Sequence, residues 1–242
     1  MTQYIQAGLF VLLAISAFAK WLQVRERPHA HLAFATMFFG LSQLSSAVTQ
    51  TIYTSHGELI PRPISIMTGL LLYLYVSGFM LFLNDFIPFP RWSKVLFVTA
   101  TVLGMVVSLV VRPEIALIDD KLVHLESVDN FIPYSAYITF ALAYILLAFG
   151  VLFVSFTRYG LRVDGLARFR MLSIGGGFFL LFAAIALLPF ILIGDPDRAF
   201  VHQVIGAVRL LALLCAPLLY LGFTPPSWVR RRVERPDRTV AA

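Results

Sequence analysis

The chain has 242 residues, of which 59% are apolar and only 13% charged, and its formal net charge at pH 7 is +6. With a mean hydropathy of +0.83, this composition excludes a soluble globular domain and predicts an integral membrane protein. The positive charge does not indicate nucleic-acid binding, because most basic residues lie in connections between apolar segments, where membrane orientation accounts for them.

Seven apolar segments reach the roughly 20 residues that an α-helix needs to cross the hydrocarbon of a bilayer. They predict an all-α, polytopic transmembrane domain over residues 1–224, followed by a basic cytoplasmic tail over residues 225–242. The first segment is interpreted as a span and not as a cleaved signal peptide, because basic residues follow it and none precedes it. The predicted spans are 3–24, 31–53, 63–86, 92–111, 133–156, 169–193 and 199–223.

The distribution of Lys and Arg predicts the orientation of the chain. Fourteen of the nineteen basic residues lie in the connections 20–30, 87–94 and 157–170 and in the tail, four lie in the alternate connections, and Arg209 lies within a span. Because basic residues favour the cytoplasmic side, the N-terminus is predicted to be outside and the C-terminus inside. We expect a multi-pass protein of a bacterial inner membrane.

The longest connection on the predicted outer side covers residues 112–133. It contains IALIDDKLVHL, in which two short apolar runs flank Asp119 and Asp120. This pattern predicts a small β-hairpin lying over the outer surface of the helices.

Polar side chains at mid-depth in the spans are the first candidates for a functional site. Arg209 lies near the middle of the last span, where a charge costs from about 3 to more than about 10 kcal/mol, so such residues usually face a bundle interior or a wet cavity. No Asp or Glu lies in the interior of a predicted span to pair with it, since Asp85 and Asp195 are at span ends. Gln43, Tyr73, Tyr75 and Tyr144 lie at about the depth of Arg209, whereas Gln50 and His202 lie nearer the outside. Gln43 and Gln50 share one helical stripe, and His202 and Arg209 share another. The predicted ligand-binding layer consists of Arg209, Gln43, Tyr75, Tyr144, His202 and Gln50.

A purely structural interpretation of this layer stays open. Gln43, tyrosine hydroxyls, carbonyls near Pro217 or water could accept the hydrogen bonds of Arg209 within the bundle. The Ser and Thr residues of the second span are interpreted as interhelical packing, and Gly175–Gly177 as a point of close helix approach, because no strand precedes the glycines as a phosphate-binding loop requires.

The sequence offers no recognisable catalytic constellation. It lacks an HExxH motif, a CxxC motif and a Ser/His/Asp arrangement, so no catalytic residue and no metal site is predicted, and the identity of any cofactor is left open. Lys20, Lys94 and Lys121 all lie outside the last span. A retinal Schiff base of the rhodopsin type is therefore not expected.

The segment that follows the last span combines an aromatic residue with a basic cluster. Aromatic rings favour the headgroup region, and basic side chains favour the anionic cytoplasmic leaflet. The sequence therefore predicts the lipid bilayer as a partner. The predicted membrane-anchor residues are Trp228, Arg230, Arg231 and Arg232.

The exit from the last span reads YLGFTPPSWVRRRVERP over residues 220–236, and the outer connection contains IDDKLVHLE. Together with seven spans of this orientation, these sequences resemble the seven-helix membrane input region at the N-terminus of bacterial sensory histidine kinases and diguanylate cyclases. In those proteins an aromatic-Leu-Gly-Phe-x-Pro-Pro-x-Trp-x-Arg-Arg exit leads into cytoplasmic signalling domains. The resemblance implies a sensor module without its own output domain, which argues against catalytic activity.

Three classes of function are compatible with the sequence. The first is a non-enzymatic membrane sensor or regulatory module that binds a small ligand or membrane component and signals through its last helix to a separate protein. The second is a small-molecule or lipid transporter that uses the mid-depth layer, although no inverted repeat is visible. The third is a membrane enzyme or cofactor-binding protein. The oligomeric state is left open, a homodimer included.

Overall fold

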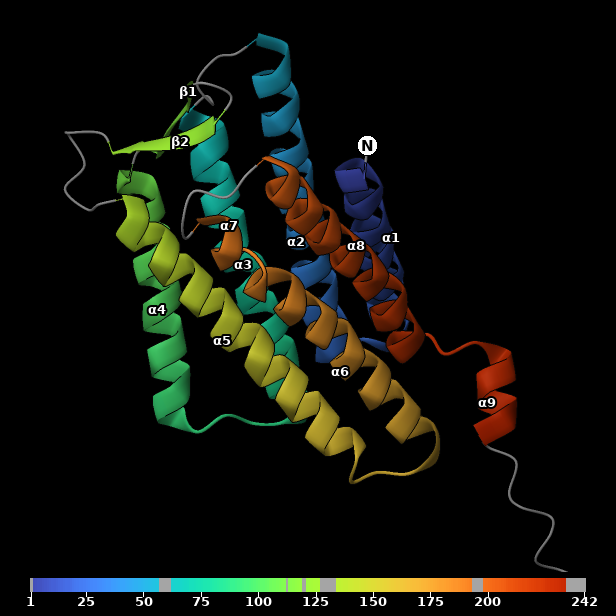
Figure 1. Ribbon diagram of the computed structural model, residues 1–242. Helices are drawn as coiled ribbons and strands as arrows, with labels where there is room; N and C mark the ends of the chain where they lie inside the picture. The colour runs from blue at the N-terminus through green and yellow to red at the C-terminus, as the bar shows by residue number, and fades with distance from the viewer. Residues whose placement is uncertain are drawn as a thin grey trace, which may run out of the picture. The chain divides into compact units, whose positions relative to one another are not determined.

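The computed structural model describes residues 2–56, 62–111, 113–118, 121–126, 134–192 and 198–233, and these ranges are mainly helical (Figure 1). By its internal contacts the chain divides into two units, Met1–Ile145 and Leu146–Ala242, each of which is described by itself. The helix α5 contributes its first part to the first unit and its remainder to the second. The elements are α1 (Thr2–Val24), α2 (Arg27–His56), α3 (Arg62–Phe86), α4 (Arg91–Val110), β1 (Pro113–Ile118), β2 (Lys121–Glu126), α5 (Tyr134–Gly160), α6 (Gly165–Ala186), α7 (Pro189–Leu192), α8 (Arg198–Phe223) and α9 (Ser227–Val233).

Each of the seven predicted spans overlaps one long helix. The largest difference is at the end of the sixth segment, where α6 stops at Ala186 and a separate short helix, α7, begins at Pro189. Proline has no N–H for an intrahelical bond and its ring clashes with the preceding turn, so a break before Pro189 is expected.

Six helices of the described residues are long and apolar enough to cross a membrane. They include all the long helices except α2. The helix α2 has 30 residues, which is ample length, but Ser42, Gln43, Ser45 and Ser46 make its sequence more polar than the others. A helical protein with several candidate membrane spans is therefore confirmed, whereas the count of seven spans and the orientation stay predictions.

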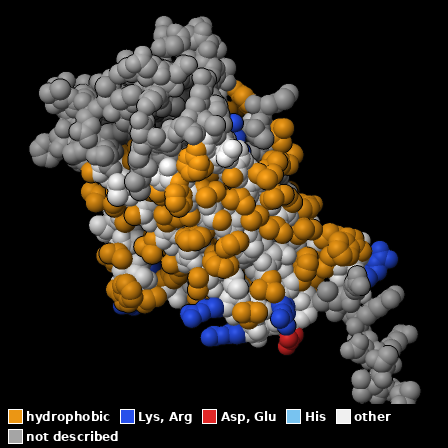
Figure 2. Space-filling model, in the orientation of Figure 1, with side chains coloured by type: hydrophobic (Ala, Val, Ile, Leu, Met, Phe, Trp, Pro, Cys, Tyr) orange, Lys and Arg blue, Asp and Glu red, His pale blue; other side chains and the backbone are white. Residues whose placement is uncertain are grey.

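The exposed face of α4 is apolar and its buried face is polar. Thr101, Gly104 and Ser108 are its buried residues, at helical spacing i, i+3 and i+7. Its exposed residues include Val102 and Leu103, which are 53% and 52% exposed. Figure 2 shows apolar side chains spread in the same way over the visible helix surfaces. This is the reverse of a helix in a soluble protein, and it is the arrangement expected of a helix surrounded by lipid.

In the first unit, α1, α2 and α3 pack in sequence order, α2 between the other two. The ring of Phe39 on α2 lies 4.3 Å from that of Phe10 on α1 and 4.9 Å from that of Tyr75 on α3 (centroid distances). On the same helix pair, a Cβ atom placed on Gly78 of α3 would lie 2.8 Å from Cα of Ala35 on α2. Such close approach is typical of packing between membrane helices.

The predicted hairpin is present. Strands β1 and β2 pair antiparallel, with Pro113 opposite Glu126 at one end and Ile118 opposite Lys121 at the other. Asp119 and Asp120, which stand between the two strands in the sequence, lie outside the described residues. The predicted hairpin is thus confirmed as secondary structure, and its place on an outer surface stays a prediction.

In the second unit, α6 packs closely against α8. A Cβ atom on Gly177 would lie 2.9 Å from Cδ2 of Leu219, and one on Gly222 would lie 2.5 Å from Cγ1 of Ile174. The other side of α6 meets α5, where Gly175 leaves room for the side chain of Thr157. These contacts confirm that the Gly175–Gly177 run allows close helix approach.

Candidate functional site

A cluster of buried hydroxyl groups joins α3, α4 and α5 in the first unit. Two tyrosines of α5 bond to the polar face of α4: the hydroxyl of Tyr144 lies 2.8 Å from Oγ1 of Thr101, and that of Tyr137 lies 2.8 Å from Oγ of Ser108. Ser77 of α3 donates a longer hydrogen bond of 3.3 Å to Thr101. We call Tyr73, Ser77, Thr101, Ser108, Tyr137 and Tyr144 the hydroxyl cluster.

The direction of these hydrogen bonds follows from proton counting. A hydroxyl has one proton to donate. Thr101 donates its proton to the carbonyl oxygen of Phe97 at 2.9 Å, and Ser108 donates to that of Gly104 at 2.8 Å. Tyr144 is therefore the donor to Thr101, and Tyr137 is the donor to Ser108.

Tyr73 is the most closely packed side chain of the hydroxyl cluster. Its side chain is fully buried, and its ring centroid lies 5.2 Å from that of Tyr144. The ring packs flat against Gly104, where a Cβ atom would overlap it. Because α4 has a glycine at this point, its backbone can approach α3 closely enough for Thr101 and Ser108 to reach their partners.

Four residues of the predicted layer lie in the first unit, and the three whose side chains are described are found in different surroundings. Tyr144 belongs to the hydroxyl cluster. Tyr75 is buried with its ring edge-on to Phe39, while Gln43 on α2 is half-buried. Positions 73 and 75 are about 200° apart around a helix, which explains why Tyr73, and not Tyr75, packs against α4. The side chain of Gln50 lies outside the described residues.

Arg209, the central residue of the predicted layer, lies on α8 in the second unit. It is half-buried, and its Nε is shielded from solvent. The side chain of His202 lies outside the described residues. Because the predicted layer would join residues of both units, it stays a prediction.

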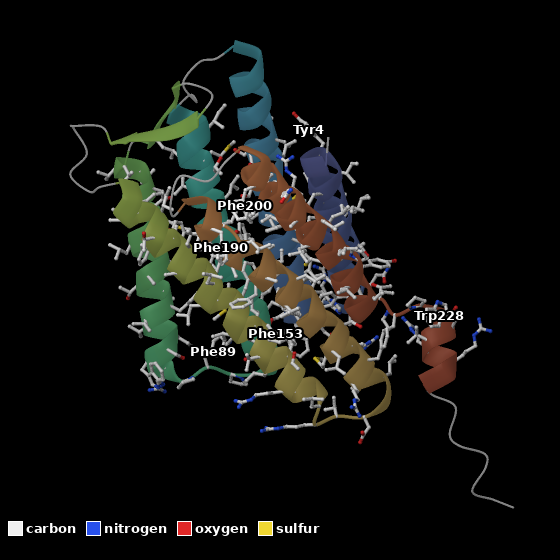
Figure 3. All side chains as sticks on the ribbon, in the orientation of Figure 1. Tyr4, Phe89, Phe153, Phe190, Phe200 and Trp228 are labelled. Atoms are coloured by element: carbon white, nitrogen blue, oxygen red, sulfur yellow. The ribbon has the colours of Figure 1, made fainter. Side chains whose placement is uncertain are left out.

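The predicted anchor residues lie on α9, directly after α8. Trp228, labelled at α9 in Figure 3, is 62% exposed, and Arg231 on the same helix is also exposed. Arg230 donates a hydrogen bond from Nε to the carbonyl oxygen of Pro225 at 3.2 Å. The side chain of Arg232 lies outside the described residues.

The sequence did not predict an ion pair between α2 and α3. Nδ1 of His31, near the start of α2, lies 2.7 Å from Oδ2 of Asp85, near the end of α3, and the side chain of Asp85 is only 13% exposed. Both residues were visible as polar groups at span ends. Their positions in the sequence could have predicted the pair, because two consecutive antiparallel helices place the start of the first beside the end of the second.

Within the part of the chain that the structure describes, no three His, Cys, Asp or Glu residues come together as a metal site would require. The described polar groups that do converge are mainly hydroxyls, which can exchange hydrogen bonds with a carbonyl or hydroxyl ligand.

Comparison of the chain with models of protein families, with curated proteins and with solved structures finds no match. The functional argument therefore rests on the residues and contacts described above.

Proposed function

We propose that the protein is a seven-span membrane module of the sensor or regulatory type, with its N-terminus outside and its C-terminus in the cytoplasm. It binds a small ligand or membrane component through the layer that contains Arg209, and it passes a movement of α8 to a separate signalling protein. Tyr144 supports this layer, because a tyrosine hydroxyl can accept a hydrogen bond as well as donate one, as a guanidinium partner or a hydroxyl ligand requires.

The observation that carries the proposal is the coupling of the last long helix to the segment that follows it. Gly222, near the end of α8, lies so close to α6 that its Cβ position is 2.5 Å from Ile174 and 3.0 Å from the carbonyl oxygen of Arg170. After Gly222 the chain turns into α9, whose Val229 is only 3% exposed.

This coupling favours transmission by a packed element over a flexible connection. Packed interfaces switch between discrete arrangements and do not deform continuously, so a shift of α8 against α6 moves the chain beyond it. Two residues of the exit sequence have packing roles in this chain: Gly222 permits the close helix contact, and Pro225 accepts the hydrogen bond of Arg230.

A fused reporter tests transmission directly. With a diguanylate cyclase catalytic domain fused after Ala242, Gly222→Val should change reporter activity several-fold, because the added side chain forces α8 away from α6. Gly206→Val is the matched control on the same helix, since no atom lies within 4 Å of its Cβ position. Equal effects of the two substitutions at equal membrane levels would contradict the proposal.

The orientation is tested separately by accessibility. A cysteine placed in the connection 112–133, in a variant whose native Cys215 is replaced by Ala, should react with a membrane-impermeant maleimide in intact cells. A fluorescent reporter after Ala242 should be cytoplasmic. Labelling of the 112–133 cysteine only after permeabilisation would reverse the proposed orientation.

A further inference from the structure

The end of the second unit where α5 joins α6 carries many arginines. Arg158, Arg162 and Arg168 are exposed there, and Figure 2 shows blue side chains where α5 ends and again at α9. Among the described residues of this end the acidic side chain is Asp164, so six positive charges face one negative charge. We call this set the basic end: Arg158, Arg162, Arg168, Arg170, Arg230 and Arg231.

Contacts within the second unit bring these residues to the same end. A short turn joins α5 to α6, so the last residues of α5 and the first of α6 are neighbours. The end of α8 lies against the start of α6, because Gly222 is close to Arg170 and Ile174. The helix α9 follows α8 and also contacts α6.

Arg170 differs from the other arginines of the basic end. It lies four residues before the buried Ile174 and therefore on the same face of α6, the face that meets α8. Its side chain is half-buried, and its Nε is enclosed with no hydrogen-bond partner among the described residues. A buried guanidinium nitrogen without an acceptor is costly, so the Nε of Arg170 favours an anion beside it.

The helix α9 is positioned to complete such a site. Its buried Val229 fixes which side of α9 faces the protein, and the bond from Nε of Arg230 to Pro225 holds that guanidinium near the turn. The terminal nitrogens of Arg230 and the exposed Arg231 remain as donors. The exposed Trp228 places an aromatic ring beside them, at the level that tryptophan prefers near headgroups.

We propose that Arg170, Arg230 and Arg231 form a specific binding site for a phosphate group, supplied by an anionic phospholipid. The planar guanidinium group matches the geometry of phosphate oxygens and binds them through two parallel hydrogen bonds. The enclosed Nε of Arg170 distinguishes this site from a diffuse attraction between basic loops and the membrane surface. The inference is independent of the proposed sensor function.

The test uses the full chain in nanodiscs of phosphatidylcholine with and without phosphatidylglycerol. Native mass spectrometry counts the retained phosphatidylglycerol, and a melting curve measures the stabilisation it gives. Arg170→Gln should reduce the apparent affinity for phosphatidylglycerol about tenfold or more, the loss expected for one charge-assisted hydrogen bond. Arg168→Gln, which removes the same charge from an exposed position on the same helix, should reduce it by less than about threefold.

The double variant Arg230→Gln/Arg231→Gln gives an independent measure, which also serves if Arg170→Gln does not fold. It should lose phosphatidylglycerol retention as Arg170→Gln does. Equal losses for Arg168→Gln and Arg170→Gln, or full retention in the α9 double variant, would overturn the site.

Two further arms identify the anion. Inorganic phosphate added to phosphatidylcholine nanodiscs should not reproduce the stabilisation; if it does, phosphate recognition stands and the lipid source is wrong. Replacing the tail carboxylates by Glu234→Gln/Asp237→Asn should leave lipid retention unchanged or increase it. Loss of the Arg170 effect in that variant would show that the tail, and not phosphate, is the partner of Arg170, and would overturn the proposal.

Discussion

Two helices of this protein are held by different means. In the first unit, α4 is attached through the hydroxyl cluster, in which small polar residues form hydrogen bonds with tyrosines of α5. In the second unit, α8 is attached to α6 through glycines that bring the helices into direct contact. Since lipid is as apolar as the side chains, helices in a membrane gain little from hydrophobic burial, and each attachment must rely on directed bonds or close packing.

The difference predicts how each attachment fails. A hydrogen bond between membrane helices contributes on average only about 0.6 kcal/mol, so a hydroxyl can be lost at low cost. A side chain inserted between closely packed backbones cannot be accommodated without a shift, which costs about 1–3 kcal/mol. Substitutions that insert a side chain should therefore lower the unfolding free energy more than the loss of a hydroxyl group does, in both regions.

The largest effect is expected for Gly104→Ala. The added methyl group overlaps the ring of Tyr73, which is fully buried and cannot move aside, so unfolding free energy should fall by about 3 kcal/mol. Gly222→Ala should cost less, about 1–2 kcal/mol, because its Cβ position lies 2.5 Å from the nearest atom, Cγ1 of Ile174, which is a smaller overlap than that of Gly104 with the Tyr73 ring. Equilibrium unfolding in mixed detergent measures both. Gly206→Ala is the control, and a cost at Gly206 equal to that at Gly222 would refute the steric interpretation.

The ion pair between α2 and α3 should give the next largest effect. Asp85→Ala removes the acceptor of His31 from a site that is 13% exposed, and a loss of about 2 kcal/mol is expected for a hydrogen bond to a charged group. Asp164→Ala, at an exposed position without a side-chain capping bond, should leave unfolding unchanged. If the two substitutions have the same effect, the His31–Asp85 contact contributes nothing specific.

A double-mutant cycle tests whether the predicted layer joins the two units. If Arg209 and Gln43 share one site, Arg209→Gln and Gln43→Leu should be coupled by about 1 kcal/mol in unfolding free energy. Two residues that act only within their own units should instead give additive changes. The cycle measured with Arg209→Lys separates charge from hydrogen-bond geometry, because lysine lacks the planar pair of donors. Additivity within error would mean that the layer does not form.

The smallest effect is expected for Tyr144→Phe. This change removes the donor to Thr101 and keeps the ring that packs beside Tyr73, so a loss of about 0.6 kcal/mol is expected. Tyr159→Phe, on an exposed part of the same helix, is the matched control and should have no measurable effect. A loss above about 2 kcal/mol at Tyr144 would show that the hydroxyl cluster acts as a cooperative network.

The positions of the long helices could be predicted because each follows from a local property, an uninterrupted apolar run bounded by charged or proline-containing connections. The hairpin at β1 and β2 was also readable, since its two apolar runs are separated by two acidic residues. The glycines of α6 predicted a point of close helix approach, because membrane helices use small residues where their backbones meet, but they did not identify α5 and α8 as the partners.

The side-chain partners were not readable in the same way. Tyr73 and Tyr75 have the same depth in α3, and only the packing of neighbouring helices shows which of them meets α4. The pairing of His31 with Asp85 depends on the rotation of two helices about their axes, which an apolar run leaves unspecified. The predicted layer illustrates the same limit, since depth along a span does not determine which face a residue occupies.

The lengths of α2 and α4 determine how the protein responds to bilayer thickness. At 1.5 Å per residue, the 30 residues of α2 extend about 45 Å and the 20 residues of α4 about 30 Å. In the proposed arrangement, fitting α2 into a hydrocarbon layer of about 30 Å by tilting alone would require about 48°, beyond the range of about 0–40° seen for membrane helices. Part of α2 therefore projects into the aqueous phase.

The helix α4 has no length to spare. Its first turn contains the exposed Trp92 and Lys94, so the apolar part from Val95 to Val110 extends only about 24 Å. In the proposed arrangement the long side chain of Lys94 would reach back towards the headgroups, and the bilayer would thin around this helix. Hydrophobic mismatch would then act on α4, and the hydroxyl cluster would transmit a change in acyl-chain length to α3 and α5.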